Sequence, residues 1–220
     1  MPVKLAFDAL NLTTNKAGIG NYIHYFLLQL IENKKDDEIE IDVYINNDVE
    51  LDVEKYPPNI TFITFNILSN SHRLLLQLFL SIYYQNKYDL IFTPDYPFPL
   101  FLNKKIKLIS IIPDLSIFKR KGDYKIFQYL SKRIGYLRVI NRANLIITYS
   151  ESVKRDLLNF FPQLDENSIK PIWLGISPQF KNDLLISPTI INKVKEKYDL
   201  NYNYFLFVGT MMPRKNLINI

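Results

Sequence analysis

Short apolar runs alternate along the chain with longer segments in which apolar residues recur at helical spacing. The short runs are nearly continuous in Val, Ile, Leu and Phe, which is typical of parallel strands buried on both faces, with helices covering the sheet. This order predicts an α/β fold. The expected strands are residues 3–7, 39–45, 60–65, 88–93, 106–112, 145–149, 169–173 and 204–208, and the expected helices are 20–33, 72–85, 124–142, 153–160 and one opening at Ser187-Pro188.

The last expected strand is set apart from the others by a polar stretch. We therefore expect one domain over residues 1–182, a linker with a helix over 183–202, and the first strand and turn of a second domain over 203–220. The short segment 203–220 cannot by itself bury the helix that begins at its end. We interpret the chain as a fragment or a truncated gene product.

Composition excludes several classes of protein. The chain has 220 residues and no cysteine, which excludes a disulfide scaffold, thiolate zinc and iron–sulfur clusters. Its two histidines, His24 and His72, leave little for a histidine-rich metal site. The N-terminus has no apolar signal core, and the longest apolar stretch, 74–84, is too short to span a bilayer. These features predict a cytoplasmic protein, with peripheral binding to the inner face of the membrane as an alternative.

The net charge of +5 hides a strong asymmetry. Residues 101–142 hold eleven Lys/Arg and two Asp, a local charge of +9, while all other residues together carry −4. Apolar residues at helical spacing within this block predict an amphipathic helix with a cationic face. That face is either solvated or attracted to an anionic membrane or lipid-linked acceptor; nucleic acid is a third option without a supporting motif. The apolar positions are Ile126, Leu130, Ile134 and Leu137, and the cations of segment 119–142 are Lys119, Arg120, Lys121, Lys125, Lys132, Arg133, Arg138 and Arg142.

Candidate ligand-binding residues follow the ends of the expected strands, where open α/β sheets bind ligands. After the first strand, Gly18 and Gly20 precede Asn21 at the start of a helix. Glycines there let backbone amides approach an anion, which the helix dipole also favours. The third glycine of a dinucleotide fingerprint is absent, so a plain turn is the alternative.

Four acidic or hydroxyl side chains follow later strands. Asp95 lies in a proline-rich loop and Asp114 follows the strand 106–112; each is a candidate base or partner of a sugar hydroxyl, and a loop or cap aspartate otherwise. Ser150 and Glu151 follow the strand 145–149, where a helix cap and a first-turn acid are the structural alternative.

Together these segments resemble glycosyltransferase family 4, which has the GT-B fold, and in particular its mannosyltransferase-like members. The order and spacing match over nearly the whole chain. The resemblance rests on residues 7–9 (Phe-Asp-Ala) with 17–22 (Ala-Gly-Ile-Gly-Asn-Tyr), 113–116 (Pro-Asp-Leu-Ser), 143–157, and 208–210 (Val-Gly-Thr) with 213–217 (Pro-Arg-Lys-Asn-Leu).

The resemblance implies two Rossmann-like domains facing each other across a cleft, of which this chain supplies the N-terminal, acceptor-binding half. It places Gly18 and Gly20 near the phosphates of a nucleotide-sugar donor. It matches Lys215 to a lysine that pairs with the donor diphosphate, with Arg214 as its neighbour. Asp114 is the catalytic candidate, although the family usually has His before this aspartate and the chain has Pro113.

The implied reaction is the transfer of a hexose, with mannose as one candidate, from a nucleotide-sugar to a polysaccharide or lipid-linked acceptor. It retains the anomeric configuration and needs no metal or other cofactor. We expect the chain alone to be inactive, because the donor half is absent. One alternative is a non-catalytic split or degenerate module that pairs with a separately encoded donor domain. A nucleotide-dependent oxidoreductase is a third, disfavoured by the incomplete glycine pattern.

Overall fold

The computed structural model describes residues 2–12, 18–32, 38–66, 76, 79–94, 101–176, 180, 187–209, 211 and 215–219. The chain divides into two compact units, residues 1–174 and 175–220. This division lies ahead of the boundary at 182 that the sequence suggested. Each unit is described below by itself.

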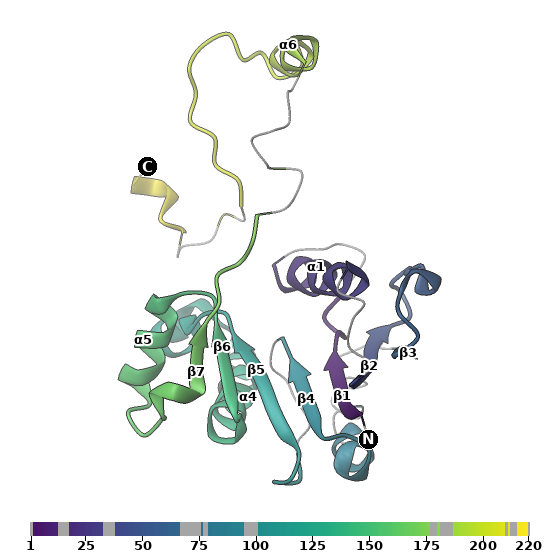
Figure 1. Ribbon diagram of the computed structural model, residues 1–220. Coiled ribbons are helices and arrows are strands. Elements are labelled where there is room, and N and C mark those ends of the chain that lie inside the picture. The colour runs from purple at the N-terminus through teal and green to yellow at the C-terminus, as the bar shows by residue number, and fades with distance from the viewer. Residues whose placement is uncertain are drawn as a thin grey trace. The chain divides into compact units, whose positions relative to one another are not determined.

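The first unit is built on a seven-stranded sheet in the order β3-β2-β1-β4-β5-β6-β7, and every neighbouring pair of strands is parallel (Figure 1). The α/β, Rossmann-like fold predicted from the sequence is confirmed. The strands are β1 (Val3–Asp8), β2 (Ile39–Asn46), β3 (Ile60–Phe65), β4 (Leu90–Thr93), β5 (Lys107–Ile112), β6 (Leu145–Thr148) and β7 (Ile169–Pro171).

The helices between these strands cover both faces of the sheet. They are α1 (Ile19–Glu32), α3 (Ser116–Lys119), α4 (Ile126–Arg142) and α5 (Glu151–Phe160), with short 3-10 turns η1 (Val53–Lys55), η2 (Tyr84–Asn86), η3 (Lys121–Asp123) and η4 (Glu166–Ser168). Of the helix expected over 72–85, residues 76 and 79–83 are described as helical, and 84–86 form the 3-10 turn η2.

Two apolar cores lie on opposite faces of the sheet because side chains alternate along each strand. Within β5, Leu108 and Ile112 pack with α4 and α5, whereas Ile111 packs in the core that holds Ile23 and Leu27 of α1. The strands thus carry apolar residues on both faces, as their nearly continuous apolar runs predicted.

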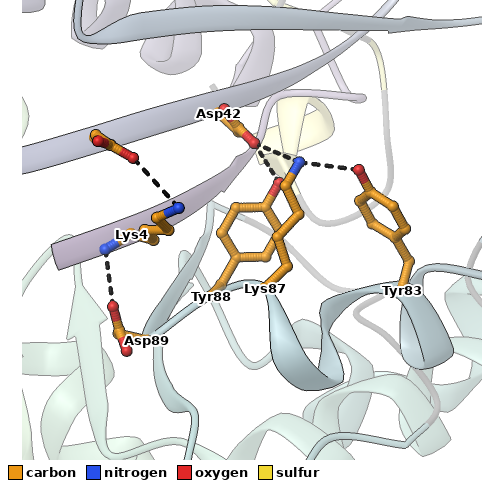
Figure 2. A network of polar contacts seen from close by, with 7 residues as sticks. Lys4, Asp42, Tyr83, Lys87, Tyr88 and Asp89 are labelled. Carbon is orange, nitrogen blue, oxygen red and sulfur yellow. Dashed lines mark hydrogen bonds and ion pairs between the residues drawn. The ribbon is translucent and has the colours of Figure 1, made fainter. Parts of the chain in front are cut away.

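A polar network joins the start of β4 to β2 (Figure 2). The Lys87 ammonium lies 2.8 Å from an Asp42 carboxylate oxygen and donates to the Tyr83 hydroxyl at 2.9 Å. The Tyr88 hydroxyl donates to the same Asp42 oxygen and shares a hydrogen bond with the Tyr44 hydroxyl. These contacts connect strand β2 to the segment that leads into β4, and they are part of the scaffold, away from the carboxyl ends of the strands.

The second unit contains α6 (Pro188–Lys197) and the 3-10 turn η7 (Leu217–Asn219). The helix opens as predicted: Pro188 is in the first turn, and the Ser187 hydroxyl accepts from the Thr189 N–H at 3.3 Å. The strand predicted over 204–208 is wrong. Those residues form no strand, and Phe205 is fully exposed. A strand needs backbone partners, and the described residues of this unit include no strand for it to pair with.

Candidate active site at the carboxyl edge of the sheet

The sheet changes its direction of growth between β1 and β4. From β1 the order runs through β2 to β3 on one side, and from β4 through β5 to β7 on the other. Because all strands are parallel, their carboxyl ends share one edge (Figure 1). In such sheets, ligands bind outside the carboxyl ends at this switch point. The candidate residues of the first unit that the structure describes follow β1, β5 and β6, so they gather at this edge.

The glycine turn sets up the start of α1. Gly18 has a φ of +52°, a left-handed conformation that L side chains rarely adopt, so glycine is needed there. Gly20 has ordinary backbone angles, and a Cβ at this position would lie 3.6 Å from the Asn11 carbonyl oxygen, at normal contact distance. Asn21 is exposed in the first turn of the helix. The two glycines therefore differ: Gly18 makes the turn, and Gly20 lies close to the loop that precedes it.

Aromatic side chains hold α1 over the switch point. The Phe26 ring packs against Phe7 of β1 and Phe92 of β4, with centroid distances of 4.9 and 5.3 Å. Nearer the glycine turn, Tyr22 contacts Tyr149, the residue after β6, at 5.7 Å. Burial raises the pKa of Tyr22 to about 12.

Tyr22 and Tyr149 were not among the predicted site residues, although both lie in segments on which the family resemblance rests. Both sit beside residues that were, since Tyr22 follows Asn21 and Tyr149 precedes Ser150. The sequence signal that could have identified them was an aromatic residue next to each turn. Apolar residues at such places usually belong to a core, so the pattern alone did not separate them from packing residues.

Asp114 lies in the turn after β5 and is exposed. One of its carboxylate oxygens accepts from the Ser116 backbone N–H at 2.8 Å, an Asx-type turn that opens α3. The Ser116 hydroxyl in turn shares a 2.7 Å hydrogen bond with the Tyr124 hydroxyl just before α4. These bonds orient the carboxylate at the edge of the sheet.

Ser150 is the N-cap of α5. Its hydroxyl accepts from the Val153 N–H at 3.3 Å, and its carbonyl accepts from the Thr148 hydroxyl at 3.1 Å. Glu151 is exposed in the first turn of the same helix, where the helix dipole favours an acid. The structural roles expected for these two residues are thus present.

The register brings the turns after β5 and β6 next to each other. Ile112 of β5 pairs with Thr148 of β6. Asp114 and Ser150 therefore each come two residues after a matched pair on adjacent strands. The contact of Tyr22 with Tyr149 connects the start of α1 to the end of β6. The backbone amides at the start of α1, the Asp114 carboxylate and the Ser150 hydroxyl therefore form one polar edge.

The remaining predicted residues are Asp95, Arg214 and Lys215. Asp95 and Arg214 lie outside the described residues. Lys215 is exposed in the second unit, which is a separate body from the sheet domain. Within the described part of the chain, no group of three or more His, Asp or Glu side chains is arranged to hold a metal ion.

Comparison with known proteins gives a likeness in structure only. No protein-family model matches the chain. A search of curated proteins also found no match. The structure of Anabaena HepE in complex with UDP and glucose is 16% identical, with a TM-score of 0.50 over 91% of this chain and 51% of HepE. A Rickettsia africae glycosyltransferase is 15% identical, with a TM-score of 0.44 over 92% of this chain and 51% of its own. The apo lipopolysaccharide galactosyltransferase WaaB is 12% identical, with a TM-score of 0.46 over 80% of this chain and 46% of its own.

The chain thus spans about half the length of the solved structures it matches. The likeness to HepE concerns the fold: a parallel, Rossmann-like α/β domain corresponding to the N-terminal half of a GT-B glycosyltransferase. The fold predicted from the sequence is confirmed at this level.

Proposed function

We propose that this chain is the acceptor-side part of a glycosyltransferase. The observation that carries the proposal is the sheet order β3-β2-β1-β4-β5-β6-β7, whose carboxyl edge gathers the glycine turn, Asp114 and Ser150 in a GT-B-like domain. The structure of HepE, whose fold is similar, contains UDP and glucose. This supports a nucleoside diphosphate hexose as donor, with glucose or mannose as the sugar and a polysaccharide or lipid-linked glycan as acceptor.

The reaction breaks the bond between the sugar C1 and a diphosphate oxygen. It forms a bond from C1 to an acceptor hydroxyl oxygen, whose proton leaves for a base or for the departing diphosphate. In our proposal the transfer retains the anomeric configuration and uses no metal. Asp114, exposed at the carboxyl edge, is the candidate that takes the proton of the acceptor hydroxyl or orients this hydroxyl.

The other candidate residues bind the substrates. The backbone amides at Gly18 and Gly20 open a helix N-terminus, which suits the donor phosphates. Asn21 and Glu151 are exposed at the same edge and can bond to sugar hydroxyls, as we propose also for Ser150 and Asp95. Cationic side chains would neutralise the leaving diphosphate, and for this we propose Arg214 and Lys215.

The diphosphate must be stabilised from both sides of the cleft, so we expect this chain alone to be inactive. The test is release of nucleoside diphosphate from a panel of nucleotide-sugars. We expect no release by the 220-residue chain, and release by a chain that carries the residues encoded after codon 220 or by a mixture with a separate donor domain. Failure of every such combination would contradict the proposed activity, and turnover by the 220-residue chain would contradict its inactivity alone.

A non-catalytic module is the second candidate, favoured by Pro113, which stands where the family that the sequence resembles usually has a histidine before the aspartate. In that case the chain pairs with a separately encoded donor domain, or is a degenerate remnant. The DNA downstream of codon 220 separates these possibilities, since an adjacent reading frame that encodes a donor domain favours a split enzyme. Thermal stabilisation by a nicotinamide cofactor, and none by nucleotide-sugars, would instead favour an oxidoreductase.

A further inference from the structure

Helix α4 is apolar on two faces. It packs onto the sheet through Tyr129, Tyr136, Val139 and Ile140, which are buried. The apolar stripe that the sequence showed at helical spacing is a different one and points outward. Three of its four members remain exposed to solvent, Ile126 by 53%, Leu130 by 45% and Ile134 by 50%, and the neighbouring Phe127 is exposed by 84%; the fourth, Leu137, is half-buried.

A second segment extends this exposed stripe. Phe101, in the loop before β5, is 70% exposed. Its backbone is fixed by the Ser81 hydroxyl, which accepts from its N–H at 3.2 Å, and by the Gln85 amide, which donates to its carbonyl at 3.2 Å. A shallow groove of about 490 Å³ lies between the two segments, lined by Phe101, Leu102, Ile134, Leu137, Arg138, Asn141 and Arg142. We call Phe101, Ile126, Phe127, Leu130 and Ile134 the α4 outer face.

The α4 outer face is bordered by positive charge. Helix α4 contains four cations and no acidic residue. Arg138 is exposed and lines the groove, and Lys125 is exposed at the start of the helix. The whole segment 101–142 carries a net charge of +9. An apolar strip edged by Lys and Arg is suited to the interface of an anionic bilayer, where side chains enter the acyl boundary and cations contact headgroups.

We propose that the α4 outer face docks on the surface of an anionic phospholipid bilayer. Among the described residues no helix is long and apolar enough to cross a membrane, so the contact we infer is with the surface. A second copy of the chain fits this face poorly. A two-fold dimer places the same patch on both partners, so it would set one cationic border against the other.

The orientation of α4 connects this surface to the carboxyl edge. Before the helix, the Tyr124 hydroxyl bonds to Ser116, whose N–H bonds to Asp114. At the other end, Arg142 donates to the Ile106 carbonyl, just before β5 begins. The α4 outer face therefore starts beside the candidate active site and runs to the opposite edge. If the proposed function holds, docking brings that site to the membrane surface, where a lipid-linked acceptor lies; docking itself does not depend on the reaction.

The experiment is co-sedimentation of the 220-residue chain with phosphatidylcholine vesicles containing about 30 mol% phosphatidylglycerol, compared with phosphatidylcholine alone. We expect binding to the anionic vesicles that weakens strongly at about 0.5 M salt. Phe127→Ser with Ile134→Ser should weaken it at least about tenfold by removing apolar insertion. Lys125→Glu with Arg138→Glu should weaken it by a similar factor by reversing charge.

Control variants carry changes of the same kind elsewhere in the first unit. Val53→Ser alters an apolar side chain that is 51% exposed on η1, and Arg155→Glu with Lys170→Glu reverses two exposed cations of the first unit; both should bind close to wild type. Circular dichroism melts check that each variant is folded, and Phe101→Ser replaces any double variant that is not. Vesicle binding requires no turnover, so the result is independent of the glycosyltransferase assay.

Three outcomes overturn the proposal. One is equal or absent binding to both kinds of vesicle. Another is unchanged binding by both double variants. The third is that the chain does not bind vesicles and forms a dimer in sedimentation velocity, and that Phe127→Ser with Ile134→Ser dissociates this dimer. That result would assign the α4 outer face to a second copy of the chain.

Discussion

The ring of Tyr22 lies against the ring of Tyr149, with their centroids 5.7 Å apart and their planes tilted by 41°. Tyr22 is in the first turn of α1, after the left-handed Gly18, and Tyr149 is the residue between β6 and the N-cap Ser150. The contact therefore connects the glycine turn to the start of α5. It joins two parts of the candidate site that are far apart in sequence.

A double-mutant cycle tests this connection. We expect Tyr22→Leu and Tyr149→Leu each to lower the free energy of unfolding, and the pair to show a coupling of about 0.5–1.5 kcal/mol, the usual strength of an aromatic pair. Urea denaturation of the four proteins measures it. As a control, Tyr22→Leu combined with Tyr56→Leu, which contacts Phe62 in β3, should be additive within about 0.5 kcal/mol. A coupling indistinguishable from zero would show that the two rings do not support each other.

The Asp42 carboxylate should matter more for stability than an exposed acid with the same kind of partner. It is 20% exposed and binds both Lys87 and the Tyr88 hydroxyl. Removing it leaves these partly buried groups without their acceptor, so we expect Asp42→Ala to cost about 1–3 kcal/mol. The matched control is Asp52→Ala, whose 2.8 Å pair with Lys55 is more than half exposed on both sides and should cost less than about 1 kcal/mol. Equal losses in urea denaturation would contradict the structural role of the network.

The buried tyrosines predict loss of stability at alkaline pH. Burial raises the pKa of Tyr22 and of Tyr44 to about 12, from an ordinary value of 10.0. The unfolded chain therefore releases these protons at a pH where the folded chain still holds them. The stabilisation is fully present below about pH 10 and falls as the pH rises towards about 12.

Denaturant titrations between about pH 8 and about pH 12 measure this slope. We expect Tyr22→Phe with Tyr44→Phe to make this slope shallower, because two of the ionisable groups are gone. Tyr84 and Tyr88, whose pKa burial also raises, keep part of it. Tyr202→Phe, at a side chain that is 74% exposed, should leave the slope as in wild type. A double variant that loses stability with pH as steeply as wild type would rule out these two tyrosines as the cause.

The sequence predicted the parts of the fold that local pattern determines. The buried runs at 3–7 and 106–112 became β1 and β5, because apolar residues on both faces of a strand suit a covered parallel sheet. The run at 204–208 is also apolar and formed no strand, because pairing depends on neighbours that a local pattern does not contain.

Helical periodicity was ambiguous in a similar way. It identified α4 correctly, but helical spacing alone cannot say which of two apolar stripes meets the sheet; the structure buries Tyr136 and Val139 and leaves Leu130 exposed. At the candidate site, the turns could be predicted from residue type and strand ends. Contacts across the edge, such as that of Tyr22 with Tyr149, could not, since they join residues more than a hundred positions apart.

Asp114 allows a test that separates catalysis from folding. Its carboxylate accepts from the Ser116 N–H, and an asparagine oxygen can accept the same bond, so Asp114→Asn should change the unfolding free energy by less than about 0.5 kcal/mol. If the carboxylate takes the proton of the acceptor hydroxyl or orients this hydroxyl, its neutral replacement should lower kcat by about a hundredfold or more in the chain joined to a donor domain. The control, Asp123→Asn, changes another acid of the same segment, 3.9 Å from Arg120, and should keep wild-type turnover. Full activity of Asp114→Asn would show that the reaction does not need the negative charge of this carboxylate, because asparagine lacks that charge. Asp114 would then be a turn-forming residue without a part in the proposed chemistry.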